Sequence, residues 1–448
     1  MSAMPAMSTN DAPRERRGDF PPAPDKLSDT GLTDDFVRDL LLKTLYVQGT
    51  RTGQQLSEFV AIPFGLIDDE LLTLQQRRFI EVRGTHGPNR ASYIFDLVGE
   101  GRARAKDAFE ASQYVGPAPV PLPQYRERME IQSIRHSHVT QDVLRDGLSH
   151  LVLEDGLFDM LGPAVNSSKS IFLYGHPGNG KTAIAEAVSQ MLGGSVFIPH
   201  AVEVDGQIMT VFDPVHHDPI DEGPGAPGME GIWLRKDSYD RRYAHCRRPI
   251  VITGGELTLD QLDLQYDPFT KLYQAPFQVK ANGGVLIVDD FGRQRVPPRD
   301  LLNRWIVPLE KRMDYLTMHT GGKFPIPFDC LLIFATNLEP AELVEEAFLR
   351  RIHYKIPVNN PTKSEYILIF QRVCQNEGIA FTPEALAQID HDWYRGHRIP
   401  PRACHPRDIL SHVSDIAKYM NVPPQLSTDL VDRACRSYFL SNEQDHQG

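Results

Sequence analysis

The sequence has few cysteines, and their spacing suggests neither a disulfide bridge nor a metal site. Its 448 residues hold five, and none belongs to a CxxC pair. Neither a disulfide framework nor a zinc site is therefore expected. Dispersed free thiols suit a reducing compartment, and we expect the protein to be cytoplasmic. The cysteines are Cys246, Cys330, Cys374, Cys404 and Cys435.

Long apolar runs are also missing. No stretch approaches the length of about 18 residues that a membrane-spanning helix needs, so no membrane partner is predicted. Residues 1–29 are rich in Pro, Ala and charge and lack the apolar core of a signal peptide. We predict that this segment and residues 442–448 are disordered tails. The net charge of −12 argues against a chain that coats nucleic acid.

The region 30–112 has the pattern of a small helical domain with a hairpin. The stretch Tyr93-Ile-Phe-Asp-Leu-Val-Gly-Glu-Gly-Arg resembles the junction between wing and helix in winged-helix domains. That resemblance implies DNA binding or protein interaction. We predict helices over 34–47, 54–60 and 66–78, strands over 79–83 and 91–97 with a turn at 84–89, and a last helix after Gly101.

Charge disfavours DNA as the partner of this domain. Residues 30–112 carry 12 acidic and 10 basic side chains, and the third helix carries Asp68, Asp69 and Glu70. DNA phosphates repel such a face. We therefore favour interaction with a protein and keep DNA as the alternative. The following segment, 113–124, has four prolines between Pro117 and Pro123, which predicts a semi-rigid spacer that lets the domain move.

Short apolar runs alternate with helical stretches over 125–358, a pattern typical of a parallel α/β sheet. The region 359–441 contains helical patterns only and is predicted to be an α-helical lid. The expected strands cover 170–174, 195–198, 249–253, 285–288 and 331–335. The expected lid helices cover 363–376, 383–392, 406–420 and 427–441.

The strongest motif is Gly175-His-Pro-Gly-Asn-Gly-Lys-Thr182, which matches G-x-x-x-x-G-K-[ST] between a predicted strand and a helix over 183–192. Its glycines let backbone N–H groups point at phosphate oxygens, and the helix N-terminus adds a positive dipole end. Lys181 would reach the β- and γ-phosphates, and Thr182 would bind Mg²⁺. The predicted ATP ligands are Gly175, His176, Pro177, Gly178, Asn179, Gly180, Lys181, Thr182 and Arg407.

Polar residues follow two later strands. Asp289 and Asp290 end the apolar run Val285–Val288, where ligands of open α/β sheets bind. We expect Asp289 to hold Mg²⁺ and Asp290 to polarise the attacking water. Asn337, after Leu331–Thr336, is placed to position water or the γ-phosphate. Each residue is weak evidence alone, since an isolated asparagine is more often a cap or a turn residue.

Three arginines complete the pattern. Either Arg350 or Arg351 could be an arginine finger that stabilises the transferring phosphoryl group from a neighbouring subunit. Arg407, in Pro406-Arg407-Asp408 at the start of a lid helix, could contact the nucleotide. For each of them the simpler interpretation is a solvated surface charge, so their weight comes from the order of the motifs.

That order resembles the AAA+ superfamily of P-loop ATPases over residues 135–440. The segment Asp289–Arg304, with its Pro297-Pro298, is similar to the MoxR branch, as are a helix over 301–313 and strands over 315–319 and 324–328. The resemblance implies a P-loop α/β domain with a helical lid, ATP and Mg²⁺ as cofactors, and a homo-oligomeric ring, commonly a hexamer. It also implies remodelling of a client protein, as by a chaperone.

Two features depart from the family pattern. Asp290 stands where AAA+ proteins usually carry Glu, so hydrolysis is expected to be slow, and a nucleotide-gated switch remains an alternative. The stretch 200–278 is an insertion, expected to be an excursion near the pore or the nucleotide. It contains His216-His217-Asp218 and Cys246, but their spacing does not support a metal site. No guanine-reading Asn-Lys-x-Asp motif is found, so ATP is the expected nucleotide.

Overall fold

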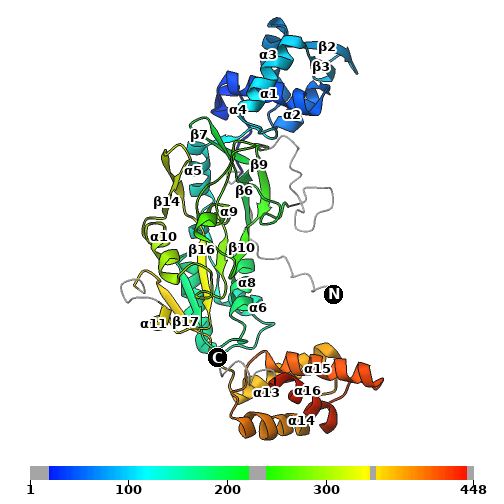
Figure 1. Cartoon of the computed structure of the whole chain (residues 1–448), viewed down its shortest axis with the longest axis vertical. Coiled ribbons are helices and arrows are strands. Elements are labelled where there is room, and N and C mark those ends of the chain that lie inside the picture. The colour runs from blue at the N-terminus through cyan, green and yellow to red at the C-terminus, as the bar shows by residue number, and fades with distance from the viewer. Residues whose placement is uncertain (1–19, 221–238, 344–349, 441–448) are drawn as a thin grey trace.

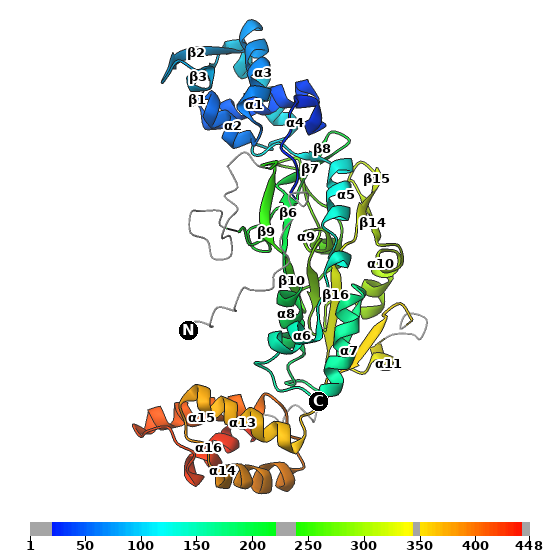
Figure 2. The same cartoon turned by 180° about the vertical axis from the view of Figure 1, so that it is seen from behind.

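The computed structural model describes residues 20–220, 239–343 and 350–440. Figures 1 and 2 show an elongated molecule, with the N-terminal domain at one end, the C-terminal helical region at the other and the sheets between them. We name this helical region the lid, after the prediction. Among the described residues, no helix is long and apolar enough to cross a membrane.

The N-terminal domain contains the predicted helices and hairpin. Thr33 caps the first helix, where its side chain accepts from the Phe36 N–H. The strands form one antiparallel sheet in the order β1-β3-β2. Gly101 has to be glycine, because a Cβ there would lie 1.8 Å from the Phe79 carbonyl oxygen. The elements are α1 (Asp34–Gln48), β1 (Arg51–Thr52), α2 (Gly53–Val60), α3 (Phe64–Gln76), β2 (Ile80–Thr85), β3 (Tyr93–Leu97) and α4 (Gly99–Ala111).

The proline-rich segment is packed, so the prediction of a spacer that lets the domain move is wrong. Strand β4 (Val120–Pro121) pairs in parallel with β7 (Ala201–Val204). The Ala118 N–H donates to the Val60 carbonyl at 2.7 Å. Ala118 and Val120, which alternate with the prolines, are fully buried. Their burial offsets the entropy of ordering the segment, which the proline content alone did not reveal.

Two further β units lie between the N-terminal domain and the parallel sheet (Figure 1). One is a mixed sheet in the order β11-β12-β8-β7-β4, in which the pairs β12–β8 and β7–β4 are parallel, and the other is the antiparallel pair β6–β9. The parts of the insertion in these two units lie beyond the N-terminal ends of the parallel strands and not near the nucleotide. Strand β10 (Ile250–Thr253), which also falls within 200–278, belongs to the parallel sheet. These elements are α5 (Leu122–Ile131), β6 (Ser195–Pro199), β8 (Gln207–Thr210), β9 (Tyr243–Arg247), β11 (Gln265–Asp267), β12 (Leu272–Gln274) and α9 (Phe277–Lys280).

Strand β6 was predicted for the parallel sheet, and that prediction is wrong. It pairs antiparallel with β9, outside the sheet. Gly193 and Gly194, just before it, have φ of 56° and 71°. Two successive left-handed residues turn the chain away from the sheet after the P-loop helix.

The P-loop domain is a five-stranded parallel sheet in the order β10-β13-β16-β5-β17, flanked by helices. Strand β17 was not predicted, because Tyr-Lys-Ile-Pro is not an apolar run. Helices α7 and α8 cover one face and α10 the other. The elements are α6 (Gln141–Gly147), α7 (Asp155–Asn166), β5 (Ile171–Tyr174), α8 (Lys181–Met191), β10 (Ile250–Thr253), β13 (Val285–Val288), α10 (Pro298–Lys311), β14 (Met313–Thr317), β15 (Lys323–Pro327), β16 (Leu331–Thr336), α11 (Pro340–Leu343) and β17 (Tyr354–Pro357).

The lid is helical, as predicted. Its apolar cluster, centred on Phe370, Ile409 and Val431, consists of lid residues only. The second predicted helix is a short α-helix that continues as a π-helix over Ile389–Arg395. The α-helices are α13 (Lys363–Glu377), α14 (Pro383–Gln388), α15 (His405–Met420) and α16 (Thr428–Leu440).

Candidate nucleotide site

The loop between β5 and α8 has the conformation of a phosphate cradle. Gly175 and Gly178 have φ of 136° and 84°, which L side chains rarely adopt. A Cβ at Gly175 would also lie 2.4 Å from the Val358 carbonyl oxygen. No side chain caps the N-terminus of α8. The N–H groups of its first turn are therefore available to an anion.

Lys181 lies across this loop. Its Nζ donates to the carbonyls of Gly175 at 2.8 Å and His176 at 2.9 Å, and to Asn337 Oδ1 at 2.7 Å. Burial lowers the pKa of Lys181 to about 8, against the opposing attraction of Asp289 and Asp290. A group whose charge is poorly solvated in this way gains most when phosphate oxygens arrive.

Thr182 and Asp289 meet at the end of β13. Thr182 Oγ1 donates to Asp289 Oδ2 at 2.9 Å. A hydroxyl and a carboxylate are hard oxygen ligands, and Mg²⁺ typically takes one or two such groups besides water and substrate phosphates. The two side chains predicted to hold Mg²⁺ therefore lie together and fit that ion.

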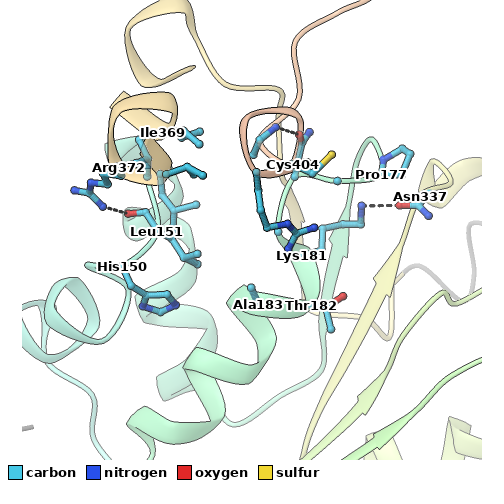
Figure 3. A pocket seen from close by; sticks show the side chains of 18 of the residues that line it. His150, Leu151, Pro177, Lys181, Thr182, Ala183, Asn337, Ile369, Arg372 and Cys404 are labelled. Atoms are coloured by element: carbon cyan, nitrogen blue, oxygen red, sulfur yellow. Dashed lines mark hydrogen bonds between the residues drawn. The ribbon is translucent and has the colours of Figure 1, made fainter. Parts of the chain in front are cut away.

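Asn337 connects the lysine to the second aspartate. Strand β16 lies between β5 and β13, so its end is placed between the two motifs. Asn337 Nδ2 donates to Asp290 Oδ1 at 3.3 Å while its oxygen accepts from Lys181. Figure 3 shows the Lys181–Asn337 contact at one side of the pocket.

The side chains of Lys181, Thr182, Asp289, Asp290 and Asn337 line a cavity of about 590 Å³ between the P-loop, the sheet and the lid. Two predicted ATP ligands, Gly175 and His176, are not among the described residues that line it. That size is within the usual range for a small-molecule site. Sequence reasoning missed the segment 150–153 and the lid residues other than Arg407, because neither belongs to a motif. The missed lining residues are His150, Leu151, Val152, Leu153, Ala183, Ile369, Arg372, Val373, Asn376, Ala403 and Cys404.

Polar contacts join the lid to the P-loop domain around this cavity. The Asn179 side chain accepts from the Ala403 N–H at 3.3 Å and donates to Asn360 Oδ1 at 2.8 Å. Arg372 of α13 donates to the Ser149 carbonyl at 2.8 Å. It also donates to the Leu151 carbonyl at 3.3 Å, the contact drawn in Figure 3. Asn179, predicted as an ATP ligand, thus directs its side chain to the lid.

The three predicted arginines fall into two groups. Arg407 lines the cavity and contacts Asp408, with Nε 3.1 Å from Oδ1. Arg350 and Arg351 are not among the described residues that line it. Arg351 Nε lies 2.7 Å from Glu310 Oε1 of α10, and Arg350 is exposed. The first residues of their motif, 347–349, lie outside the described residues.

One member of the histidine pair of the insertion, His217, has a structural role. His217 is buried; its Nδ1 accepts from the Asp213 N–H, and its Nε2 lies 2.8 Å from the Lys280 carbonyl. Burial lowers the pKa of His217 to about 4, so the ring is neutral at pH 7. Over the ranges that the structure describes, no three His, Cys, Asp or Glu side chains are grouped to hold a metal ion.

The acidic stretch of α3 is partly neutralised within its own domain. Arg90 Nε donates to both carboxylate oxygens of Asp68 at 2.8 and 3.0 Å. Glu70 is buried and forms an ion pair with Arg38. The acidic face predicted from the sequence is therefore largely used in folding, and the electrostatic argument against DNA is weaker than the sequence indicates.

Comparisons with known proteins match parts of the chain. A family model described as a domain of unknown function (DUF8689) matches residues 362–437, within the lid. No curated protein matches the chain. Similar solved structures include NtrX from Brucella abortus in complex with ADP, at 14% identity and a TM-score of 0.38, covering 64% of this chain and 56% of NtrX. They also include the Holliday junction branch migration motor RuvB of Thermotoga maritima, at 14% identity and a TM-score of 0.34, covering 68% and 72%.

The chain thus spans little more than half of NtrX. At these scores the comparisons assign neither family nor activity. The geometry of the site carries the functional conclusion.

Proposed function

We propose that this protein is a P-loop ATPase of the AAA+ type that binds Mg·ATP between its P-loop domain and its lid and hydrolyses it. One observation carries the proposal: the contacts Thr182–Asp289 and Lys181–Asn337–Asp290 join these five side chains at one end of the parallel sheet. A glycine-rich cradle and a cavity of about 590 Å³ adjoin them.

Each residue then has a defined task. The N–H groups of the loop and of α8 hold the phosphates, and Lys181 exchanges its backbone acceptors for phosphate oxygens. Thr182 and Asp289 hold Mg²⁺, which supplies charge neutralisation between the phosphates. Asp290 accepts a proton from the attacking water, and Asn337 orients that water and the γ-phosphate. Leu151, Val152 and Leu153 provide apolar surface for the adenine ring of ATP.

The finger arginines support an oligomer. Ser170, just before β5, donates from its Oγ to the Arg351 carbonyl at 3.3 Å. The arginines therefore lie at the N-terminal ends of the strands, whereas the P-loop follows the C-terminal end of β5 at Tyr174. Four strand residues span roughly 13 Å, so these side chains are poorly placed for the site of their own subunit. We infer that they act on a neighbouring subunit in a homo-oligomeric ring, a hexamer by resemblance.

The work done with ATP is inferred from the resemblance to the MoxR branch. We infer remodelling of a client protein, recruited through the winged-helix-like N-terminal domain. DNA is the second candidate client, and the ion pairs of Asp68 and Glu70 favour it more than the bare sequence does. Salt-dependent DNA binding by the full chain would replace the protein client.

The test is steady-state ATP hydrolysis against protein concentration. We expect activity per subunit to rise with concentration, and both Lys181→Ala and the double variant Arg350→Ala/Arg351→Ala to abolish it. Arg436→Ala, an exposed lid arginine paired with Asp432, is the matched control and should leave the rate unchanged. A wild type that binds ATP but turns over no faster than Lys181→Ala would replace the motor by a nucleotide-gated switch.

A further inference from the structure

Asp290 has an unusual backbone. Its φ is 48°, in the left-handed region that residues other than glycine rarely enter. It stands where the resemblance leads one to expect Glu, whose side chain is one methylene longer. A shortened carboxylate on an ordinary strand end would lie farther from the phosphates. The left-handed residue changes the direction in which that carboxylate leaves the chain.

A single glutamine holds this conformation from the C-terminal side. Gln294 Nε2 donates to the carbonyls of Asp289 at 3.0 Å and Asp290 at 3.1 Å. Its Oε1 accepts from the Gly292 N–H at 2.7 Å. The Arg293 N–H also donates to the Asp290 carbonyl at 3.0 Å. Gln294 thus closes the turn that follows β13 with three hydrogen bonds.

The neighbouring strand β16 holds the same turn from the other side. The Phe291 N–H donates to the Ala335 carbonyl at 2.8 Å. The Phe291 carbonyl accepts from Thr336 Oγ1 at 2.6 Å, and the Phe291 ring is fully buried. Asp290 therefore lies between a strand and an anchored aromatic residue, which leaves its backbone little freedom.

The Asp290 carboxylate contacts Asn337 in this backbone conformation. Asp290 Oδ1 lies 3.3 Å from Asn337 Nδ2, and Asn337 in turn contacts Lys181 at 2.7 Å. The short carboxylate therefore already reaches the group that faces the phosphates. A strained residue that persists beside a candidate site, over-determined by its surroundings, is a recognised mark of function.

We propose that the left-handed backbone of Asp290, fixed by Gln294, compensates for the missing methylene, so that Asp290 is a working base and Gln294 is its positioning residue. The inference rests on the proposed ATPase function. It reverses the expectation from the family pattern: Asp290→Glu restores the usual residue, yet in this backbone its carboxylate overshoots the position beside Asn337. A misplacement near 1 Å costs on the order of 10²-fold in rate.

A double-mutant cycle on the full-length protein tests this proposal. Asp290→Glu, Gln294→Ala and the double variant are compared with the wild type by kcat and by the Kd for Mg·ATP. Each single variant should lower kcat by about 10-fold or more and leave Kd within about twofold. The double variant should be no slower than Gln294→Ala, because a released backbone no longer distinguishes the two carboxylates.

Two controls keep the outcomes separate. Gln55→Ala removes a comparable glutamine, which accepts from the Thr52 N–H in the N-terminal domain, and should leave kcat unchanged. Lys181→Ala gives the background rate.

If hydrolysis depends on Lys181 but Asp290→Glu equals or exceeds the wild type, or the two changes are additive, the positioning role is overturned and the ATPase stands. Loss of ATP binding in Gln294→Ala also overturns it, since Gln294 would then build the pocket. A wild-type rate equal to that of Lys181→Ala overturns both proposals.

Discussion

The lowered pKa of Lys181 predicts that ATP binding takes up a proton at alkaline pH. In the protein without nucleotide, burial lowers that pKa to about 8. Phosphate oxygens favour the charged ammonium and should return the pKa to its ordinary value of about 10.5. Above pH 8 the free protein therefore holds a neutral lysine that must be protonated when ATP binds, and affinity falls as pH rises.

The size of the effect follows from those two values. A shift from about 8 to about 10.5 makes the affinity at pH 9 roughly eightfold lower than at pH 7.5. Proton uptake should rise from roughly 0.2 per ATP at pH 7.5 to roughly 0.9 at pH 9. Ordinary imidazole and phosphate groups complete their titration below this range. Burial raises the pKa of the Cys404 thiol in the pocket, which moves its titration to still higher pH.

Calorimetry in two buffers of different protonation enthalpy measures the uptake directly. Lys181→Arg is the matched control, because a guanidinium keeps its proton over this range, so its uptake should be near zero. Equal uptake by the wild type and Lys181→Arg would assign the proton to another group. No uptake by the wild type at pH 9 would show that the lysine is fully charged in the empty site, and the reasoning from burial would be refuted.

Three further predictions concern other parts of the molecule. Arg242→Ala should lower the unfolding free energy by about 3–5 kcal/mol in urea, because it leaves a buried carboxylate unpaired; a loss under about 1 kcal/mol would contradict this. Asp289→Asn should bind ATP no more tightly with Mg²⁺ than without it, as a titration with and without EDTA would show. Mixing inactive Lys181→Ala subunits with inactive Arg350→Ala/Arg351→Ala subunits should restore ATPase activity, and a silent mixture would exclude action between subunits.

The sequence predicted the parts of the site that depend on local structure. Gly175–Thr182 carries its own backbone requirement, and apolar strands that end in Asp289 or Asn337 place polar groups at one edge of a sheet. The segment 150–153 could not be assigned in this way. It reaches the cavity only because α13 packs over it through Arg372, a contact between distant parts of the chain that no local pattern encodes.

The same distinction explains the errors in the fold. Strand β17 is recognised only by its pairing with β5, since its side chains are of mixed polarity. The proline-rich segment has the composition of a spacer, yet its apolar residues complete a core that the N-terminal domain shares with strands β7 and β8 through Ala201 and Ile208. Composition describes a segment by itself, whereas these outcomes depend on the surfaces that the rest of the chain presents to it.

Packing also indicates which part responds to nucleotide. The N-terminal domain shares an apolar core with the middle sheet, and the buried Arg242 donates there to the Thr30 carbonyl at 2.8 Å and to Gln124 Oε1 at 3.1 Å. The lid's apolar cluster, in contrast, contains lid residues only. Polar contacts such as those of Asn179 and Arg372 join the lid to the P-loop domain. Such hydrogen bonds can be exchanged for hydrogen bonds to water at little cost in free energy. Because Asn179 belongs to the phosphate loop itself, we expect nucleotide binding to move the lid. We expect the N-terminal domain, in contrast, to move together with the P-loop domain as a rigid unit.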